Sequence, residues 1–378
     1  MAMQDLKQVY SYKNQYVPDP KHLIEQIINK TVIPHQIEVQ PGPKSKSLCW
    51  LKCPYCYGGS SEMSGESLDD TRYIEVLSEI AQGGVKKFIF AGYATDPLNY
   101  KYIDNLVNVP FTYNAIIGFH TKAIKVSNDL IDMIATNEID PKSYFSVSVD
   151  AGDSQTYNKV HGMNEFGPNI YDRVKQNIEK ITNKIAAEHS QTTTSATYLL
   201  NSHNSDLKQV AKFIHDFKTL GVDLIRFSFP QTPRGYETAL SSDENIPDRD
   251  EKSIIMKDLF RYIKEEDSEE CRVLAIDYDV QMDIENVART LPCFARWVFP
   301  SIGFDGYLGH CSEAAAPHFR EMSLGNLNNS NFWDLYYDYD SEKLKETLRH
   351  SSKKMSQLDC RCDRKEHQVN QIMKTLKF

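Results

Sequence analysis

The sequence predicts an α/β protein built from parallel strand–helix units, and three observations support this fold class. Six short segments rich in β-branched and aromatic residues follow one another between about residues 36 and 230. The stretches between them have apolar residues three and four positions apart, as amphipathic helices do. The chain has 378 residues, of which 40% are hydrophobic and 25% charged, so it can bury a large core. Strands that alternate with helices run parallel, in an open sheet or a barrel.

Each element can be placed along the chain from these patterns. The expected strands are QIEVQ near residue 38, KFIFAG at 87–92, YNAIIGFH at 113–120, YFSVSVD at 144–150, TSATYLL at 194–200 and DLIRFSF at 223–229. The expected helices span 67–82, 99–107, 127–136, 169–187 and 205–219. Parallel sheets and barrels build their active sites at the carboxyl ends of their strands, so the residues after each strand are the first candidates for function.

Composition shifts along the chain predict its domain organisation. We expect an N-terminal extension at 1–35, a core of strand–helix units at 36–235, an acidic linker at 236–290 and a second, smaller domain at 291–378 that ends in a basic tail.

Charge and hydropathy exclude several classes of protein. The net charge of −9 argues against a general nucleic-acid binder. The longest apolar runs fall well short of the ~18 residues that a membrane-spanning helix needs, and the polar N-terminus lacks the apolar segment of a secretory signal. We therefore expect a cytoplasmic protein that binds neither nucleic acid nor membrane. Its eight cysteines are then reduced thiols, available for metal or redox chemistry rather than for disulfides.

Three of these cysteines lie within the segment SLCWLKCPYCYGG, at Cys49, Cys53 and Cys56. A structural zinc site would require a second C-x2-C pair or a matching Cys/His partner, and the later cysteines contain no such pair. An iron–sulfur cubane normally has four thiolate ligands. Three thiolates from one loop would hold three irons and leave the fourth open for a substrate or cofactor. The loop also follows the first strand directly, where a catalytic centre belongs.

The spacing C-x3-C-x2-C, with Tyr55 before the last cysteine, resembles the signature of radical S-adenosylmethionine (SAM) enzymes. The turn AGYATDPLNY after the second strand is similar to that family's Gly-Gly-Glu-Pro turn. GFHTKA at 118–123 loosely resembles its Thr-Asn-Gly turn. The fourth strand, SVSVDAGDSQ, is similar as well. The resemblance implies SAM contacts at Tyr55, where the ring would pack beside the adenine, and at Gly92, Thr95, Asp96, Ser148 and Asp150.

The same resemblance implies a fold and a chemistry. The fold would be a partial (β/α)6 TIM-like barrel. Cys49, Cys53 and Cys56 would hold a [4Fe-4S] cluster whose open iron binds SAM. An electron from an external donor such as flavodoxin or ferredoxin would cleave SAM to a 5′-deoxyadenosyl radical, which abstracts a substrate hydrogen atom.

A second cysteine set lies in the C-terminal region. Cys293 and Cys311 flank a hairpin signal at Asp305-Gly306, and Cys360 and Cys362 form a Cys-x-Cys pair in a polar segment. Spacing alone leaves zinc and an iron–sulfur cluster both open for this set. The segment from Cys293 to Cys311 is similar to the start of the SPASM and twitch extensions of radical SAM enzymes. That resemblance implies one auxiliary [4Fe-4S] cluster, whose negative charge Arg361, Arg364 and Lys365 would offset.

The last cysteine, Cys271, lies in the strand-like segment CRVLAIDYD. We expect it to be a core residue of a strand. The alternative is a thiol that donates a hydrogen atom to a substrate radical, as in some radical SAM epimerases.

The resemblance implies a tailoring step in natural-product biosynthesis, with peptide crosslinking, epimerisation or excision as the expected reactions. Dehydrogenation, epimerisation or decarboxylation of a sugar, aminosugar or nucleoside intermediate is the alternative. The roughly 35 residues before the first strand are too few for a leader-recognition domain, so such a module would be a separate protein. An electron-transfer protein without SAM chemistry and a zinc protein also stay open.

Overall fold

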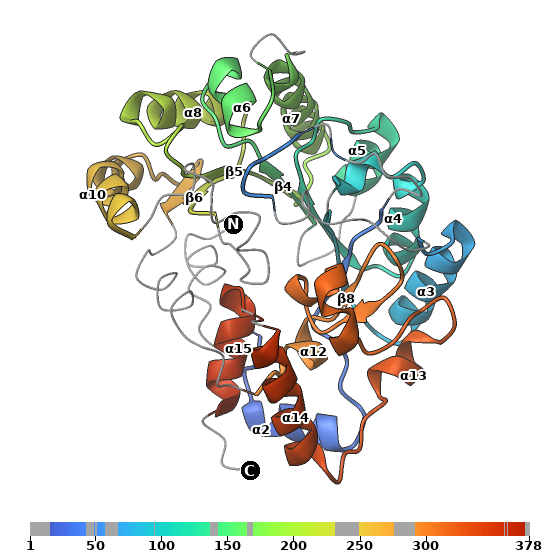
Figure 1. The fold of residues 1–378 in the computed structure, drawn as a ribbon. Helices are drawn as coiled ribbons and strands as arrows, with labels where there is room; N and C mark the ends of the chain where they lie inside the picture. Colours follow the sequence, from blue (N-terminus) through green and yellow to red (C-terminus); the bar gives the residue numbers. More distant parts are fainter. Residues whose placement is uncertain are drawn as a thin grey trace.

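The structure is a computed structural model, in which these residues are described: 16–42, 49, 51–56, 67–93, 95–136, 143–164, 169–230, 249–275, 292–358, 360 and 362–374. Its centre is a nine-stranded sheet with the order β7-β6-β5-β4-β3-β2-β1-β8-β9 (Figure 1). The first seven strands all run parallel to their neighbours. The strands are β1 (Ile37–Val39), β2 (Lys87–Phe90), β3 (Ile116–Thr121), β4 (Tyr144–Ser148), β5 (Thr193–Leu199), β6 (Leu224–Ser228), β7 (Arg272–Ala275), β8 (Ser301–Ile302) and β9 (Leu308–Gly309).

Helices follow the first six strands along the outer side of the curved sheet (Figure 1). They are α3 (Asp70–Gln82), α4 (Ile103–Thr112), α5 (Asn128–Ala135), α6 (Ser154–Val160), α7 (Ile170–Ala187), α8 (Leu207–Thr219) and α10 (Arg249–Glu265). The six expected strands and five expected helices are confirmed. The helix expected at 99–107 begins later, because Pro97–Asn99 forms a separate 3-10 turn, η1. The sequence did not predict α6, which is too short for a clear apolar period.

The two faces of the sheet differ in chemistry, because successive side chains on a strand point to opposite sides. On the helix-covered face, the ring of Phe119 on β3 stacks against Phe90 at 5.6 Å and against Phe145 at 5.1 Å. The opposite face carries polar side chains such as Ser146 and Arg226. The apolar side packs the helices onto the sheet, and the polar side stays available for other chemistry.

The segment expected to be a linker contributes to the sheet. Strand β7 pairs in parallel with β6, and α10 packs against it. The acidic composition of 236–290 predicted a solvent-exposed linker. The short run Arg272–Ala275 nevertheless has enough apolar character to add a strand at the edge of the sheet.

The C-terminal region joins the other edge of the same sheet. Strand β8 runs parallel to β1 and forms an antiparallel hairpin with β9. The predicted turn is confirmed: Gly306 has φ +80°, a value that favours glycine, and its N–H donates to the carbonyl of Gly303. The remaining elements are α12 (Ala295–Val298), η3 (Glu313–Ala315), η4 (Pro317–Met322), α13 (Phe332–Tyr336), α14 (Leu344–Gln357) and α15 (Arg364–Lys374).

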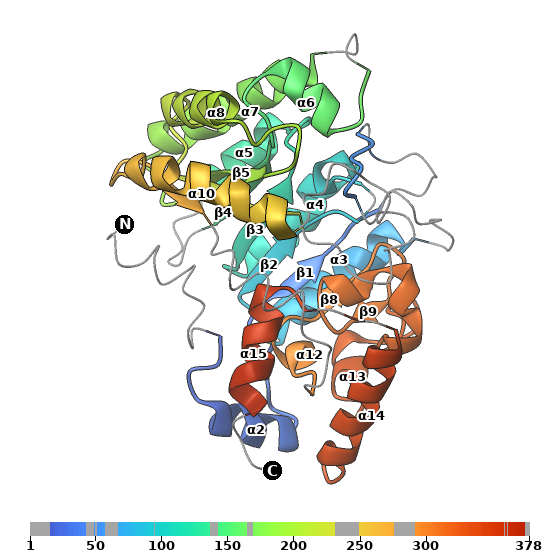
Figure 2. The same ribbon diagram turned by 60° about the vertical axis from the view of Figure 1, so that its left-hand side comes forward.

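This C-terminal region also contacts the N-terminal helix α2 (Pro20–Ile28), which lies beside it in both views (Figures 1 and 2). The hydroxyl of Tyr339 donates to the carbonyl of Ile27, and that of Tyr337 to the carbonyl of Val32. Within the described parts of the chain, no helix has the length and apolar character needed to cross a membrane.

Candidate functional site

The cysteine loop lies against the end of α6. The N–H of Lys52 donates to the carbonyl of His161 at 2.9 Å, and the side chain of Leu51 is buried. The next residue, Gly162, has φ +62°, and a Cβ atom there would lie 2.2 Å from the carbonyl oxygen of Lys52. Glycine is therefore required at this position for the loop to approach so closely. This packing fixes the loop just before its second cysteine.

The three thiols of the loop lie close enough to interact electrostatically. Cys49, Cys53 and Cys56 are partly buried and form no disulfide. Burial, together with the charges of the other two thiols and Asp150, raises the pKa of Cys53 to about 12, although the Lys122 ammonium acts in the opposite direction. Among the described residues, no three His, Cys, Asp or Glu side chains are grouped as for a single metal ion.

The carboxylate of Asp150 is the centre of a hydrogen-bond cluster beside the loop. Asp150 follows β4, is fully buried and has φ +63°. Its Oδ2 accepts from the hydroxyl of Tyr55 at 3.0 Å, from Ser148 at 3.0 Å and from Lys122 Nζ at 2.6 Å. Its Oδ1 accepts from the N–H of Leu199 at 2.8 Å. Aspartate is one of the few residues other than glycine that adopt this conformation, and the hydrogen bonds around Asp150 hold it in place. The cluster joins the cysteine loop to the ends of β3, β4 and β5.

Lys122 supplies the positive charge of this cluster. Its ammonium group donates to Asp150, to the hydroxyl of Ser148 at 3.0 Å and to Nε2 of His161 at 2.8 Å. Nδ1 of His161 lies 2.8 Å from the carbonyl of Tyr157 and donates to it. Burial and the nearby lysine lower the pKa of His161 to about 4, so the ring is neutral and its Nε2 accepts. All three N–H groups of the lysine have acceptors.

The opposite charges of Lys122 and Asp150 stabilise one another. Burial by itself raises the pKa of Asp150, but the charge of Lys122 outweighs this effect and holds the pKa far below the usual value. Burial likewise lowers the pKa of Lys122, and the Asp150 charge reverses this effect. Both groups are therefore ionised at neutral pH.

The turn after β2 forms a second part of the site. A Cβ on Gly92 would lie 1.7 Å from the carbonyl oxygen of Thr95, so this tight turn requires glycine. The carboxylate of Asp96 accepts from the hydroxyl of Thr121, at 2.8 and 2.9 Å, and from the N–H of Lys122 at 2.5 Å. Burial raises the pKa of Asp96, and these bonds partly offset that effect. The turn is thus held against the end of β3.

The structure brings the predicted residues Tyr55, Ser148 and Asp150 into one cluster, with the Gly92–Asp96 turn beside it. Sequence reasoning missed Lys122 and His161 as members of this cluster. Lys122 lies in the turn GFHTKA, directly after β3, and His161 lies in KVHG, directly after α6. The sequence does not show which side chains Lys122 and His161 contact, so it gave no reason to assign them to the site.

The second cysteine set also comes together. Cys293, Cys311 and Cys360 are all buried in one apolar cluster. Burial raises the pKa of Cys311, and the charges of Glu366, Cys360 and Cys293 raise it further. The thiol of Cys362 accepts a hydrogen bond from Asn370 Nδ2 at 3.4 Å. Oδ1 of the same Asn370 accepts from the N–H of Phe294, which follows Cys293 in the chain.

The carboxylate of Glu366 on α15 is buried next to these cysteines. No described residue donates a hydrogen bond to either of its oxygens, although Lys365 Nζ lies 3.6 Å from Oε1. Burial raises the pKa of Glu366 to about 7. Buried acidic groups are normally paired or bound to a metal, and Lys365 is a cation that lies beside this one. Arg364 and Lys365 lie in the first turn of α15, and Arg361 falls outside the described residues.

Cys271 lies away from both sets. It directly precedes β7, so it stands where the parallel strands begin, whereas the cysteine loop stands where they end. The side chain is buried in the main apolar core. This position agrees with a core residue and does not bring the thiol to the candidate site as a hydrogen-atom donor.

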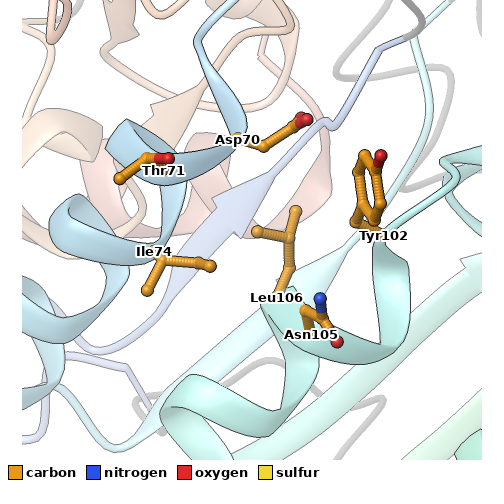
Figure 3. A pocket seen from close by; sticks show the side chains of 6 residues that line it. All are labelled: Asp70, Thr71, Ile74, Tyr102, Asn105 and Leu106. Atoms are coloured by element: carbon orange, nitrogen blue, oxygen red, sulfur yellow. The ribbon is translucent and has the colours of Figure 1, made fainter.

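A pocket of about 150 Å³ lies elsewhere, between the first turns of α3 and α4 (Figure 3). Its lining consists of Asp70, Thr71, Ile74, Tyr102, Asn105 and Leu106. None of the predicted cysteines or SAM-contact residues lines it, so we treat it as separate from the candidate site.

Comparisons with known proteins agree with this geometry. Residues 46–214 match the sequence profile of the Radical SAM superfamily. These residues include the cysteine loop and the ends of β2 to β5. No curated protein sequence matches the chain.

Solved structures share the fold at low sequence identity. SuiB of Streptococcus suis bound to S-adenosylmethionine aligns with a TM-score of 0.59 and 14% identity, over 84% of this chain and 69% of SuiB. Native anSMEcpe with bound AdoMet aligns with a TM-score of 0.56 and 14% identity, over 84% of both chains. The matched sequence, the parallel sheet and these folds agree in assigning residues 46–214 to the radical SAM superfamily.

Proposed function

We propose that Cys49, Cys53 and Cys56 hold a [4Fe-4S] cluster and that SAM binds beside it, at the ends of β2 to β5. The observation that carries this proposal is the convergence of the cysteine loop with the ends of β3, β4 and β5 around Asp150. Thiolate is the ligand that iron–sulfur clusters require, and each cysteine of a cubane binds a different iron. Three thiols that interact without meeting at one point fit that requirement.

The bound cluster would supply the electron that cleaves SAM to methionine and a 5′-deoxyadenosyl radical. The residues of this chain would bind and orient the cofactor. The Gly92–Asp96 turn places backbone groups, with no side chain at Gly92, beside the end of β3. Ser148 and Tyr55 hold fixed positions next to the cysteines through Asp150. Such fixed positions keep the reacting groups oriented and exclude water.

We propose a peptide as the substrate, in a tailoring reaction such as crosslinking, epimerisation or excision. Support comes from the shared fold of SuiB, which has been solved bound to the precursor peptide SuiA, and of anSMEcpe, solved with the Cp18Cys peptide. An external flavodoxin or ferredoxin would supply electrons, and a separate leader-recognition protein would present the peptide.

The test uses protein that has been purified and reconstituted without oxygen, then given SAM and dithionite. We expect 5′-deoxyadenosine by mass spectrometry. Adding a perdeuterated peptide pool should yield deuterated 5′-deoxyadenosine, whereas perdeuterated sugars and nucleosides should not. No 5′-deoxyadenosine from protein that contains iron and sulfide would favour an electron-transfer protein, and deuterium from sugars or nucleosides alone would reject the peptide.

We also propose that residues 291–378 form an auxiliary domain in which Cys293, Cys311, Cys360 and Cys362 hold a second [4Fe-4S] cluster. Three of these thiols are buried in one cluster, and Asn370 bonds both to Cys362 and to the N–H of Phe294, next to Cys293, which supports this proposal. With four thiolate ligands no iron would be open, so the centre would transfer electrons.

Replacing Cys311 by serine should then lower the iron content from about eight to about four atoms per chain, because one of two cubanes is lost. Cys271→Ser is the matched control and should keep both clusters. Iron analysis after reconstitution measures this, and bound zinc in place of the missing iron would contradict the auxiliary cluster.

A further inference from the structure

We infer that the Lys122–Asp150 ion pair positions the cysteine loop and sets the reduction potential of the centre that the loop holds. Both are positioning residues, and the inference rests on the proposed cluster at Cys49, Cys53 and Cys56. It assigns to Asp150 a different role from a direct SAM contact.

The first observation is that the pair is satisfied within the protein. The carboxylate of Asp150 accepts from Tyr55, Lys122, Ser148 and the N–H of Leu199. These four donors occupy most of the lone-pair positions of a carboxylate. The ammonium group of Lys122 donates its three N–H groups to Asp150, Ser148 and His161. Lys122 therefore has no N–H to spare and Oδ2 of Asp150 has no free lone pair, and the whole side chain of Asp150 is buried.

The second observation is that hydrogen bonds join the Lys122–Asp150 pair and its neighbour His161 to the cysteine loop. Tyr55 lies between Cys53 and Cys56, and its hydroxyl donates to Asp150. On the other side, the N–H of Lys52 donates to the backbone carbonyl of His161, and the ring Nε2 of the same His161 accepts from Lys122. The two bonds hold the loop on both sides of Cys53, so the pair determines where this thiol stands.

The third observation is that two opposite charges lie directly beside the loop. Asp150 Oδ2 accepts from Tyr55, two residues after Cys53, and Lys122 Nζ lies 2.6 Å from the same oxygen. The side chain of Asp150 is fully buried and that of Lys122 is 17% exposed, so solvent screens their charges little. Reducing a cluster adds negative charge, and its potential depends on nearby charge, hydrogen bonds and exposure. A cation beside it raises the potential and an anion lowers it.

The experiment measures the midpoint potential of the reconstituted protein by a titration that is followed by electron paramagnetic resonance. The centre at the cysteine loop is identified as the signal that changes when SAM is added. We expect Lys122→Met to shift its potential to more negative values and Asp150→Asn to shift it to more positive values. The double variant should lie between the two single variants. Damage to packing would move both single variants in the same direction.

Two further variants keep the test informative if a charge deletion prevents folding. Lys122→Arg retains the charge and should keep a potential close to that of the wild type. Lys175→Met and Asp216→Asn disrupt a comparable ion pair, 2.8 Å long, between α7 and α8 and away from the strand ends. They should leave the potential unchanged.

The outcomes separate this inference from the proposed function. Shifts in the same direction, or no shift, in variants that still cleave SAM would overturn the inference and leave the proposed function standing. A wild-type protein without a SAM-sensitive cluster signal would overturn the proposed function itself.

Discussion

Replacing Cys53 by alanine is expected to reduce the formation of 5′-deoxyadenosine to the background level. The thiol is central in the loop, and its two neighbours alone supply too few ligands for a cubane. The reconstituted variant should also lose the visible absorbance and the iron of one cluster. Mass spectrometry after incubation with SAM and dithionite measures the product.

Cys271→Ala provides the control for this experiment. It removes a thiol at the opposite end of the strands, so it should keep the full yield of 5′-deoxyadenosine. If Cys53→Ala still formed the product, the cluster would have to be held elsewhere, and the loop assignment would be wrong.

Replacing Gly162 by alanine is expected to have the second largest effect, although this residue is no ligand. The backbone at φ +62° costs alanine about 1 to 2 kcal/mol. The added Cβ would also lie 2.2 Å from the carbonyl of Lys52, so the cysteine loop must move. Because misplacement by about 1 Å can cost on the order of 100-fold in rate, SAM cleavage should fall to that extent. The assay is the initial rate per iron bound.

Gly221→Ala separates strain from displacement. Gly221 has φ +76°, but its added Cβ would meet only Thr182 at an ordinary 3.9 Å. This variant should lose a similar amount of stability, as seen in thermal unfolding, and keep its activity. Equal activity losses in the two variants would mean that general destabilisation, rather than loop position, is responsible.

Much of the fold could be predicted because its signals are local. The strand segments and helix periods each occupy a few consecutive residues, and side-chain caps such as Asp206 on α8 mark helix starts. The cysteine spacing of the loop is local as well, so the family could be inferred from it. Two parts of the sheet were not predicted. The strand-like segment at β7 lies in a region whose acidic composition indicated a linker, and the two-residue strands β8 and β9 are too short for a pattern of their own.

The sequence by itself determined the class of fold, the cysteine ligands to test and the strand ends where a site should lie. Only the tertiary structure decided which side chains meet there. Lys122 and Asp150 are 28 positions apart and Tyr55 and Asp150 are 95 apart, so no local pattern records these contacts. They form because parallel strands bring their carboxyl ends to one edge of the sheet. At that edge a buried charge is stable only with its partner, which is why the lysine and the aspartate occur together.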